Sequence, residues 1–218
     1  MNDSSSRDSR GEIWREVWTE RDHERADWNG FESCFESLAE YERWIETIAQ
    51  LIIDELNIGP TDVVADLGCG TGRVASLLAR RVAHVYAFDY SPTVLDVARH
   101  RRAAPNITYQ YADLNNFDPT SVAATKAYAV GSLFYLDGED TVRRLIEGFC
   151  QRGGAFAAID LPDESIVDDR ARSYDTSRYT HLRFSEARLL SWFPTGRVRR
   201  SDFVGYVNSG SRFHFFVG

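Results

Sequence analysis

Three carboxylates each follow or end a short apolar run of the chain, and a glycine-rich segment comes directly after the first. Asp66 is followed by Gly68, Cys69, Gly70 and Gly72 in the segment DLGCGTG. Glycines permit a sharp turn and a close approach of the backbone to a ligand. Carboxylates accept hydrogen bonds from hydroxyl and amino groups and attract cations. We therefore expect residues 66–72 to form part of a small-molecule site.

Asp89 and Asp113 are the other two carboxylates, placed at the end of residues 84–89 and just after residues 107–111. The oxygens of Asp89 suit both hydroxyls of a ribose, a feature shared by folds that bind NAD and folds that bind S-adenosylmethionine (SAM). Asp113 is placed to accept from an adenine amino group, with Tyr90 and Leu114 as apolar walls. An Asp at the end of a strand is often only a helix cap or a solvated group, and for Asp113 taken alone this explanation is equally good.

The glycine spacing and Asp66 separate the two cofactors. A nicotinamide dinucleotide usually requires G-x-G-x-x-G, whereas this chain has G-x-G-x-G and carries Arg73 at the position of the third dinucleotide glycine. A carboxylate at Asp66 would repel a diphosphate, but it suits the ammonium and sulfonium groups of SAM. Together the residues favour SAM.

Alternating strands and helices must position these residues. Apolar periodicity predicts helices over residues 11–21, 31–56, 72–81, 92–102 and 140–150, and strands over 63–67, 84–89, 107–111, 127–131 and 155–160. Two further runs, 197–207 and 212–217, flank a turn signal at 208–210 and should pair antiparallel. The pattern predicts an α/β fold with a doubly wound, mainly parallel sheet.

One domain is expected from the length of 218 residues. Residues 1–10 are predicted to be a flexible N-terminus, and 11–218 a single domain with a helical cap over 11–56 and a lid over 162–190. The net charge of −8 argues against nucleic acid as a partner. Three isolated cysteines indicate a reducing cytoplasm, and the apolar stretches are too short for a membrane span.

The stretch VVADLGCGTGRVASLLARRVAHVYAFDYSPTVLDVARHR, followed by ITYQYADLNNF, strongly resembles class I SAM-dependent methyltransferases over about residues 62–160. The resemblance implies a Rossmann-like sheet of seven strands with the last strand antiparallel. It also implies that Asp66, Gly68, Gly70 and Gly72 hold the methionine end of SAM, Asp89 the ribose and Asp113 the adenine. The product would be S-adenosylhomocysteine (SAH).

The segment from Trp18 to Arg21, WTER, resembles the W-D-x-R segment that many of these enzymes fold over the cofactor. Arg21 would then meet the SAM carboxylate as a charge-assisted pair. An amphipathic helical turn packed on the sheet explains both residues equally well.

Two residues are candidates for catalysis. Tyr135 ends the segment SLFY at the family position that lines the methyl channel, and it would orient or deprotonate the acceptor; a buried core tyrosine is the alternative. His181 is the best candidate base because its unperturbed pKa lies near neutrality, although surface histidines are common. Arg178 and Arg183 in the expected lid would suit an anionic acceptor.

The leading hypothesis is therefore a SAM-dependent methyltransferase acting on O or N of a small metabolite, such as a sugar, a nucleotide-sugar or a natural-product intermediate. The alternatives are an NAD(P)-dependent oxidoreductase and a SAM-binding protein without catalysis. The expected partner is a small-molecule acceptor, and the expected assembly is a monomer or a homodimer.

Overall fold

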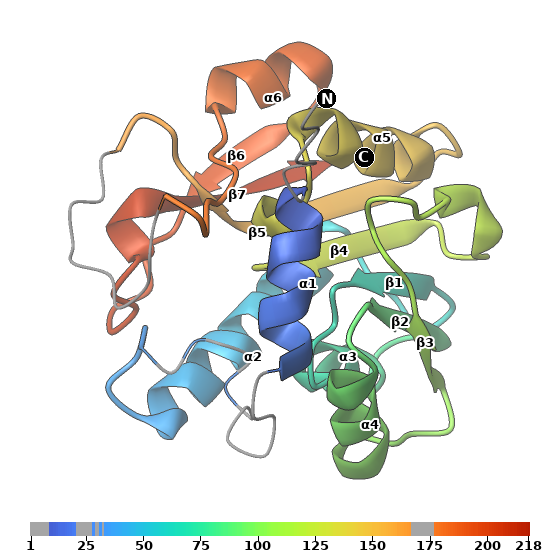
Figure 1. Cartoon of the computed structure of the whole chain (residues 1–218). Coiled ribbons are helices and arrows are strands. Elements are labelled where there is room, and N and C mark those ends of the chain that lie inside the picture. Colours follow the sequence, from blue (N-terminus) through green and yellow to red (C-terminus); the bar gives the residue numbers. More distant parts are fainter. Residues whose placement is uncertain (1–8, 21–27, 29–30, 32, 167–176) are drawn as a thin grey trace, which may run out of the picture.

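The expected alternation of strands and helices is present in the computed structural model, which describes residues 9–20, 28, 31, 33–166 and 177–218 (Figure 1). The helices are α1 (Arg10–Glu20), α2 (Leu38–Glu55), α3 (Arg73–Leu78), α4 (Pro92–Arg101), α5 (Glu139–Cys150) and α6 (Glu186–Trp192). The strands are β1 (Val63–Leu67), β2 (His84–Asp89), β3 (Ile107–Tyr111), β4 (Lys126–Val130), β5 (Ala155–Pro162), β6 (Arg197–Arg200) and β7 (Arg212–Val217).

These strands form a seven-stranded sheet in the order β3-β2-β1-β4-β5-β7-β6. The first five strands pair in parallel, and β7 pairs antiparallel with both β5 and β6. The predicted fold class is confirmed. The order reverses between β1 and β4, and in open α/β sheets the ligand site lies beyond the carboxyl ends of the strands at such a point.

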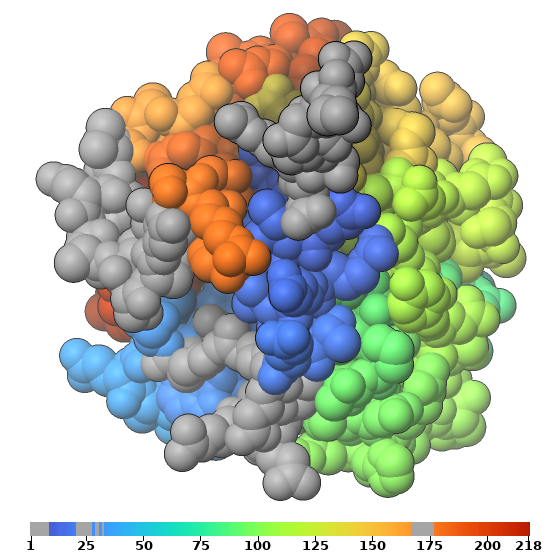
Figure 2. All heavy atoms as spheres, in the orientation of Figure 1, coloured from blue at the N-terminus to red at the C-terminus, as the bar shows by residue number. Residues whose placement is uncertain are grey.

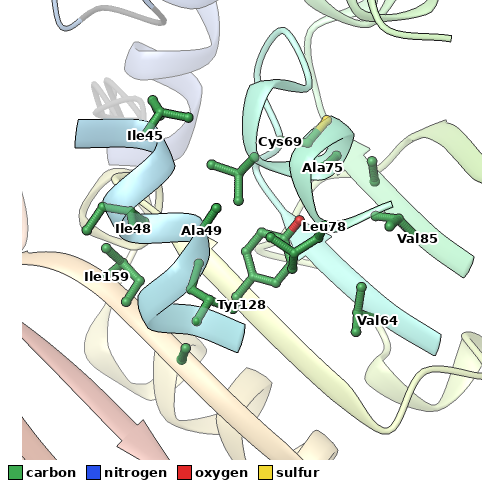
Figure 3. Close-up of a cluster of buried hydrophobic side chains, with 14 of the residues drawn as sticks. Ile45, Ile48, Ala49, Val64, Cys69, Ala75, Leu78, Val85, Tyr128 and Ile159 are labelled. Carbon is green, nitrogen blue, oxygen red and sulfur yellow. The ribbon is translucent and has the colours of Figure 1, made fainter. Parts of the chain in front are cut away.

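Helices cover both faces of the sheet because side chains of successive strand residues point to opposite sides. Val64 and Val85 pack with α2, α3 and α4, whereas Ala65 and Leu67 pack with α5 and α6. In Figure 3, Ile48 and Ala49 of α2 point towards the sheet and towards α3. Helix α1 crosses in front of the sheet between the two helical layers (Figure 1).

The second helix begins at Leu38, seven residues later than the predicted start at residue 31. Ser37 has an extended backbone and its side chain accepts from the N–H of Glu40, which is a typical N-cap arrangement. Phe31 and Phe35 nevertheless pack on Trp44, at ring-centroid distances of 4.9 and 5.6 Å. Their aromatic spacing mimicked a helix face, but they reach the core from a non-helical segment.

The last two strands confirm the antiparallel prediction but not its bounds. β6 ends at Arg200 rather than at residue 207, and the connection to β7 runs from residue 201 to residue 211. Residues 208–210 therefore do not form a tight hairpin turn. The chain leaves the sheet because Tyr206, which is 4% exposed, enters the core near α2 instead of pairing with β7.

The predicted cap and lid stay predictions. The cap contains α1 and α2, while residues 167–176 of the lid lie outside the described part of the chain. Across the described ranges, no helix has the length and apolar character needed to cross a bilayer. Cys34, Cys69 and Cys150 are free thiols, as their spacing predicted.

Candidate functional site

A cavity opens beyond the carboxyl ends of β1, β2, β3 and β4. It contains about 1060 Å³ of empty space, including its open mouth. Ten of the residues predicted from the sequence line it: Trp18, Asp66, Gly68, Cys69, Gly70, Asp89, Tyr90, Asp113, Leu114 and Tyr135. Gly72 and the predicted base His181 are not among the lining residues, and Arg21 lies outside the described residues. The parallel sheet thus brings together side chains from four separate strand ends.

The glycine segment forms the floor of this cavity. Gly68 and Gly70 have φ values of 81° and 52°, which only glycine adopts without strain. The backbone N–H groups of Gly68 and Cys69 both donate to the carbonyl of Phe88 at 2.8 Å, so the loop is tied to β2. Gly72 is the N-cap of α3, where a side chain would collide with the ring of Tyr109.

Gly68→Ala is expected to destabilise the protein by about 2–5 kcal/mol, because a positive φ is costly for alanine and the new methyl group overpacks its neighbours. An added Cβ would lie 2.4 Å from the Cβ of Ser132. Urea denaturation measures the change in the free energy of unfolding. Gly210→Ala is the matched control, because no atom lies within 4 Å of its added Cβ; equal stabilities of the two variants would contradict the prediction.

Asp66 is almost completely buried, with 2% of its surface exposed. The hydroxyl of Tyr128 donates to Oδ2 at 3.0 Å. Burial is the main cause that raises the pKa of Asp66 to about 8, and the nearby charge of Asp89 adds to it. This acid is therefore largely protonated at neutral pH until a cation comes close.

Asp89 is anchored by two backbone groups. The N–H of Gly70 donates to Oδ2 and that of Ser91 to Oδ1, both at 3.0 Å. Burial raises the pKa of Asp89, and these backbone bonds oppose the rise. A carboxylate has about four lone-pair sites, so both oxygens keep capacity for hydroxyl groups of a ligand in the cavity.

Asp113 is held by its own loop and by α1. The N–H of Asn115 donates to Oδ1 at 3.0 Å, and Arg15 forms an ion pair with Oδ2. The side chain of Arg15 is 40% exposed, and Arg15 is not among the residues predicted for the site. Arg15 lies about one helical turn before Trp18, on a helix expected to cover the site, and this position was the sequence signal for a contact with the cavity.

Helix α1 covers the cavity through contacts with three other segments. Its Arg10 donates to the carbonyls of Leu136 and Asp137 at 3.2 and 3.0 Å. The hydroxyl of Tyr90 donates to the carbonyl of Trp14 at 3.2 Å. Trp14 Nε1 donates to the carbonyl of Thr180 at 2.9 Å, which joins α1 to the chain after residue 176 (Figure 2).

The two catalytic candidates lie next to each other although 46 positions separate them in the chain. The rings of Tyr135 and His181 are 5.1 Å apart between centroids. Trp14 contacts both, at 4.8 Å from Tyr135 and 4.6 Å from His181, where the rings are stacked. Trp14 itself was not predicted as a site residue, because aromatic residues on a covering helix give no sequence signal beyond amphipathicity.

The lid arginines make contacts within the protein. Arg183 donates to the carbonyls of Asp163 and Ile166, and Arg178 pairs with Glu16 of α1 at 3.8 Å. Arg73, at the position of the third dinucleotide glycine, pairs with Glu42 at 3.2 Å. These contacts give Arg183 and Arg73 a structural role in holding the loop after β5 and the start of α3.

Residues 64–154 match the model of a family described as a methyltransferase domain. The chain is 26% identical over 131 residues to methyltransferase GfsG of Streptomyces halstedii, covering 58% of this chain and 47% of that relative. It spans about half the length of the curated relatives that it matches first.

Two solved structures share the fold across nearly the whole chain. Magnesium protoporphyrin IX methyltransferase from Synechocystis PCC 6803 with bound SAM has a TM-score of 0.67 and 12% identity, and the match covers 99% of this chain and 100% of that one. N-methyltransferase NodS from Bradyrhizobium japonicum WM9 in complex with SAH has a TM-score of 0.63 and 19% identity, with coverage of 96% and 97%.

Proposed function

From the membership of this chain in the class I SAM-dependent methyltransferases, we propose that it transfers a methyl group to O or N of a small metabolite. The observation that supports this most directly is the cavity, in which the glycine loop, Asp66, Asp89 and Asp113 face one space. The acceptor class is a sugar, a nucleotide-sugar or a natural-product intermediate.

The residues present fit SAM on chemical grounds. Among the described residues, the hydrogen bond to the Asp66 side chain comes from Tyr128, and no cation pairs with it. A buried carboxylate of this kind suits an ammonium or sulfonium group and opposes a pyrophosphate. This distinction favours SAM over the dinucleotide alternative.

Each part of the cofactor has residues that would hold it. Asp89 binds the ribose hydroxyls, Asp113 and Leu114 contact the adenine, and Asp66 with the glycine loop holds the methionine end. Bound SAM supplies a methyl group already activated by its sulfonium. The protein itself contributes alignment and exclusion of water, which account for about 7–11 kcal/mol of barrier lowering in well-oriented reactions.

Tyr135 lies on the side of the cavity that we assign to the acceptor, and His181 packs against it at 5.1 Å between ring centroids without itself lining the cavity. Tyr135 lines the cavity and orients the acceptor through its hydroxyl. His181, stacked on Trp14, takes the proton when the acceptor is a hydroxyl or an ammonium, since these groups must lose one. Trp14 and α1 close the space above both residues and keep bulk water out.

A labelled-methyl assay tests this function. Purified protein with methyl-labelled SAM is expected to transfer label to at least one member of a panel of sugar nucleotides, amines, phenols and carboxylates. Asp89→Ala provides the background rate. Tight SAM binding without transfer to any acceptor would support a non-catalytic SAM-binding protein, and failure to bind SAM would contradict the proposed function altogether.

A further inference from the structure

Arg212, the first residue of β7, does not line the cavity itself but lies one aromatic ring away from Tyr135, which does. Its guanidinium carbon is 5.0 Å from the centre of the Phe134 ring. The same ring is 4.5 Å from that of Tyr135 and 5.1 Å from that of His181. One aromatic side chain therefore separates the cation from both residues that we place at the acceptor.

Arg212 uses little of its hydrogen-bonding capacity on the residues that the structure describes. A guanidinium has five N–H donors, but Nη1 makes the one described bond, a long contact of 3.4 Å to the carbonyl of Asp160. The Asp160 carboxylate accepts from the hydroxyl of Tyr206, which lies 2.8 Å from both of its oxygens, and it acts on Arg212 through its charge without a direct hydrogen bond. Among the described residues, no ion pair includes Arg212.

Other arginines near this end of the sheet are paired directly with carboxylates. Arg188 pairs with Glu139 and Glu164 at 2.6 and 3.1 Å. Arg200, on the strand next to β7, pairs with Asp163 and Glu186. Buried charged groups usually have such partners, and Arg212 differs from Arg188 and Arg200 in making no ion pair with a described residue.

An irregular backbone fixes the position of Arg212. The pairing of β5 with β7 shifts register between Ala158 and Leu161, and Asp160 has a φ of 67°. The Asp160 N–H donates to Nδ1 of His214 at 3.1 Å, which holds this conformation. A non-glycine residue in the left-handed region is held by its surroundings and is found often at functional sites. Here it directs its carbonyl towards Arg212.

We propose that Arg212 binds an oxyanion of the methyl acceptor, a carboxylate or a phosphate group. The planar guanidinium binds such groups through two parallel hydrogen bonds, and Phe134 supports its face as a cation–π partner. The acceptor is then an anionic small molecule whose nucleophilic atom reaches Tyr135 while its anion contacts Arg212. This inference rests on the proposed function.

Titration of the SAH-bound protein with 4-hydroxybenzoate, phenyl phosphate and neutral 4-hydroxybenzamide tests the proposal. Calorimetry should show saturable binding of at least one of the two anions and at least tenfold weaker binding of the amide. Arg212→Gln should weaken anion binding at least tenfold, and Arg212→Lys should weaken it less. Preference for one anion identifies the oxyanion as carboxylate or phosphate.

The affinity for SAH shows whether Arg212→Gln damages the fold or only the binding of the anion. If Arg212 binds the anion, wild type and Arg212→Gln should bind SAH equally well. Arg199→Gln is the matched control, because Arg199 is an exposed arginine of the adjacent strand β6. Equal anion binding by wild type and Arg212→Gln, or no anion binding by wild type, would overturn the proposal. Loss of SAH binding in wild type would instead contradict the proposed function, and the same titration without SAH would then decide the role of Arg212.

Discussion

Asp89→Ala is expected to weaken SAM binding by at least about 100-fold. The variant removes two hydrogen bonds from a carboxylate to ribose hydroxyls, and hydrogen bonds to charged groups contribute about 1.5–3 kcal/mol each. It also removes the acceptors of the Gly70 and Ser91 N–H groups, which position the glycine loop. Calorimetric titration with SAM measures the change in dissociation constant.

Asp96→Ala is the control for this substitution. Asp96 lies on α4, its side chain is 66% exposed, and it pairs with Arg99 at 2.9 Å on the helix surface. Its loss should change SAM affinity less than twofold, because exposed ion pairs contribute little. The assignment of Asp89 to the ribose would be wrong if Asp89→Ala bound SAM within threefold of wild type while keeping its fold.

Asp66→Asn is expected to increase stability at alkaline pH. The folded state raises the pKa of Asp66 from 3.8 to about 8, so its neutral form is favoured on folding. The resulting stabilisation is fully present below the pKa that Asp66 has in the unfolded chain. It is lost as the pH rises through the pKa that Asp66 has in the folded protein. One pKa unit corresponds to about 1.4 kcal/mol. The contribution of Asp66 to the free energy of unfolding should therefore fall by an amount on the order of 5 kcal/mol between pH 4 and pH 8.

Urea denaturation of the SAM-free protein at pH 4, 6 and 8 measures this effect. Asp160, whose pKa burial raises to about 6, contributes to a loss of stability in the same direction as Asp66, whereas His214, whose pKa burial lowers to about 4, opposes it between pH 4 and pH 6. Both groups are unchanged in the variant, so the difference between wild type and Asp66→Asn measures the contribution of Asp66. Asp66→Asn should lose less and exceed wild type at pH 8, because its neutral amide requires no charge to be buried. Parallel pH dependences of the two proteins would contradict the assignment.

The same carboxyl group should couple SAM binding to pH. A cationic ligand favours the charged form of Asp66, so binding at pH 7 should release a fraction of a proton, and affinity should increase from pH 6 to pH 8. Calorimetry in phosphate and in Tris, which differ in heat of ionisation, measures the proton release. Asp66→Asn should bind SAM more weakly and show the same apparent heat in both buffers.

The parallel core was predictable because its signals are local. An apolar run of five or six residues bounded by glycine, proline or a cap specifies a buried strand, and β1, β2 and β3 have the predicted bounds. Residues that follow parallel strands must meet at one edge of the sheet. The sequence therefore sufficed to place Asp66, Asp89 and Asp113 around one cavity.

Predictions were less accurate where tertiary packing overrides local pattern. Phe31 and Phe35 have helical spacing but lie before the Ser37 cap, because their rings fill a space beside Trp44 from a non-helical path. The run after Arg200 has strand-like composition, yet Tyr206 leaves the sheet to donate to the buried Asp160. In both cases, contacts with distant residues outweigh the intrinsic preference of the segment.

The sheet, the glycine loop and the three carboxylates could be predicted from the amino-acid sequence, since each depends on neighbours within a few positions. The contacts of Arg15 with Asp113, of His181 with Trp14 and Tyr135, and of Arg212 with Phe134 could be seen only in the folded chain. These pairs join segments far apart in the chain, and no local periodicity encodes such a contact. Their positions follow from how α1, β7 and the segment after residue 176 pack around the end of the sheet.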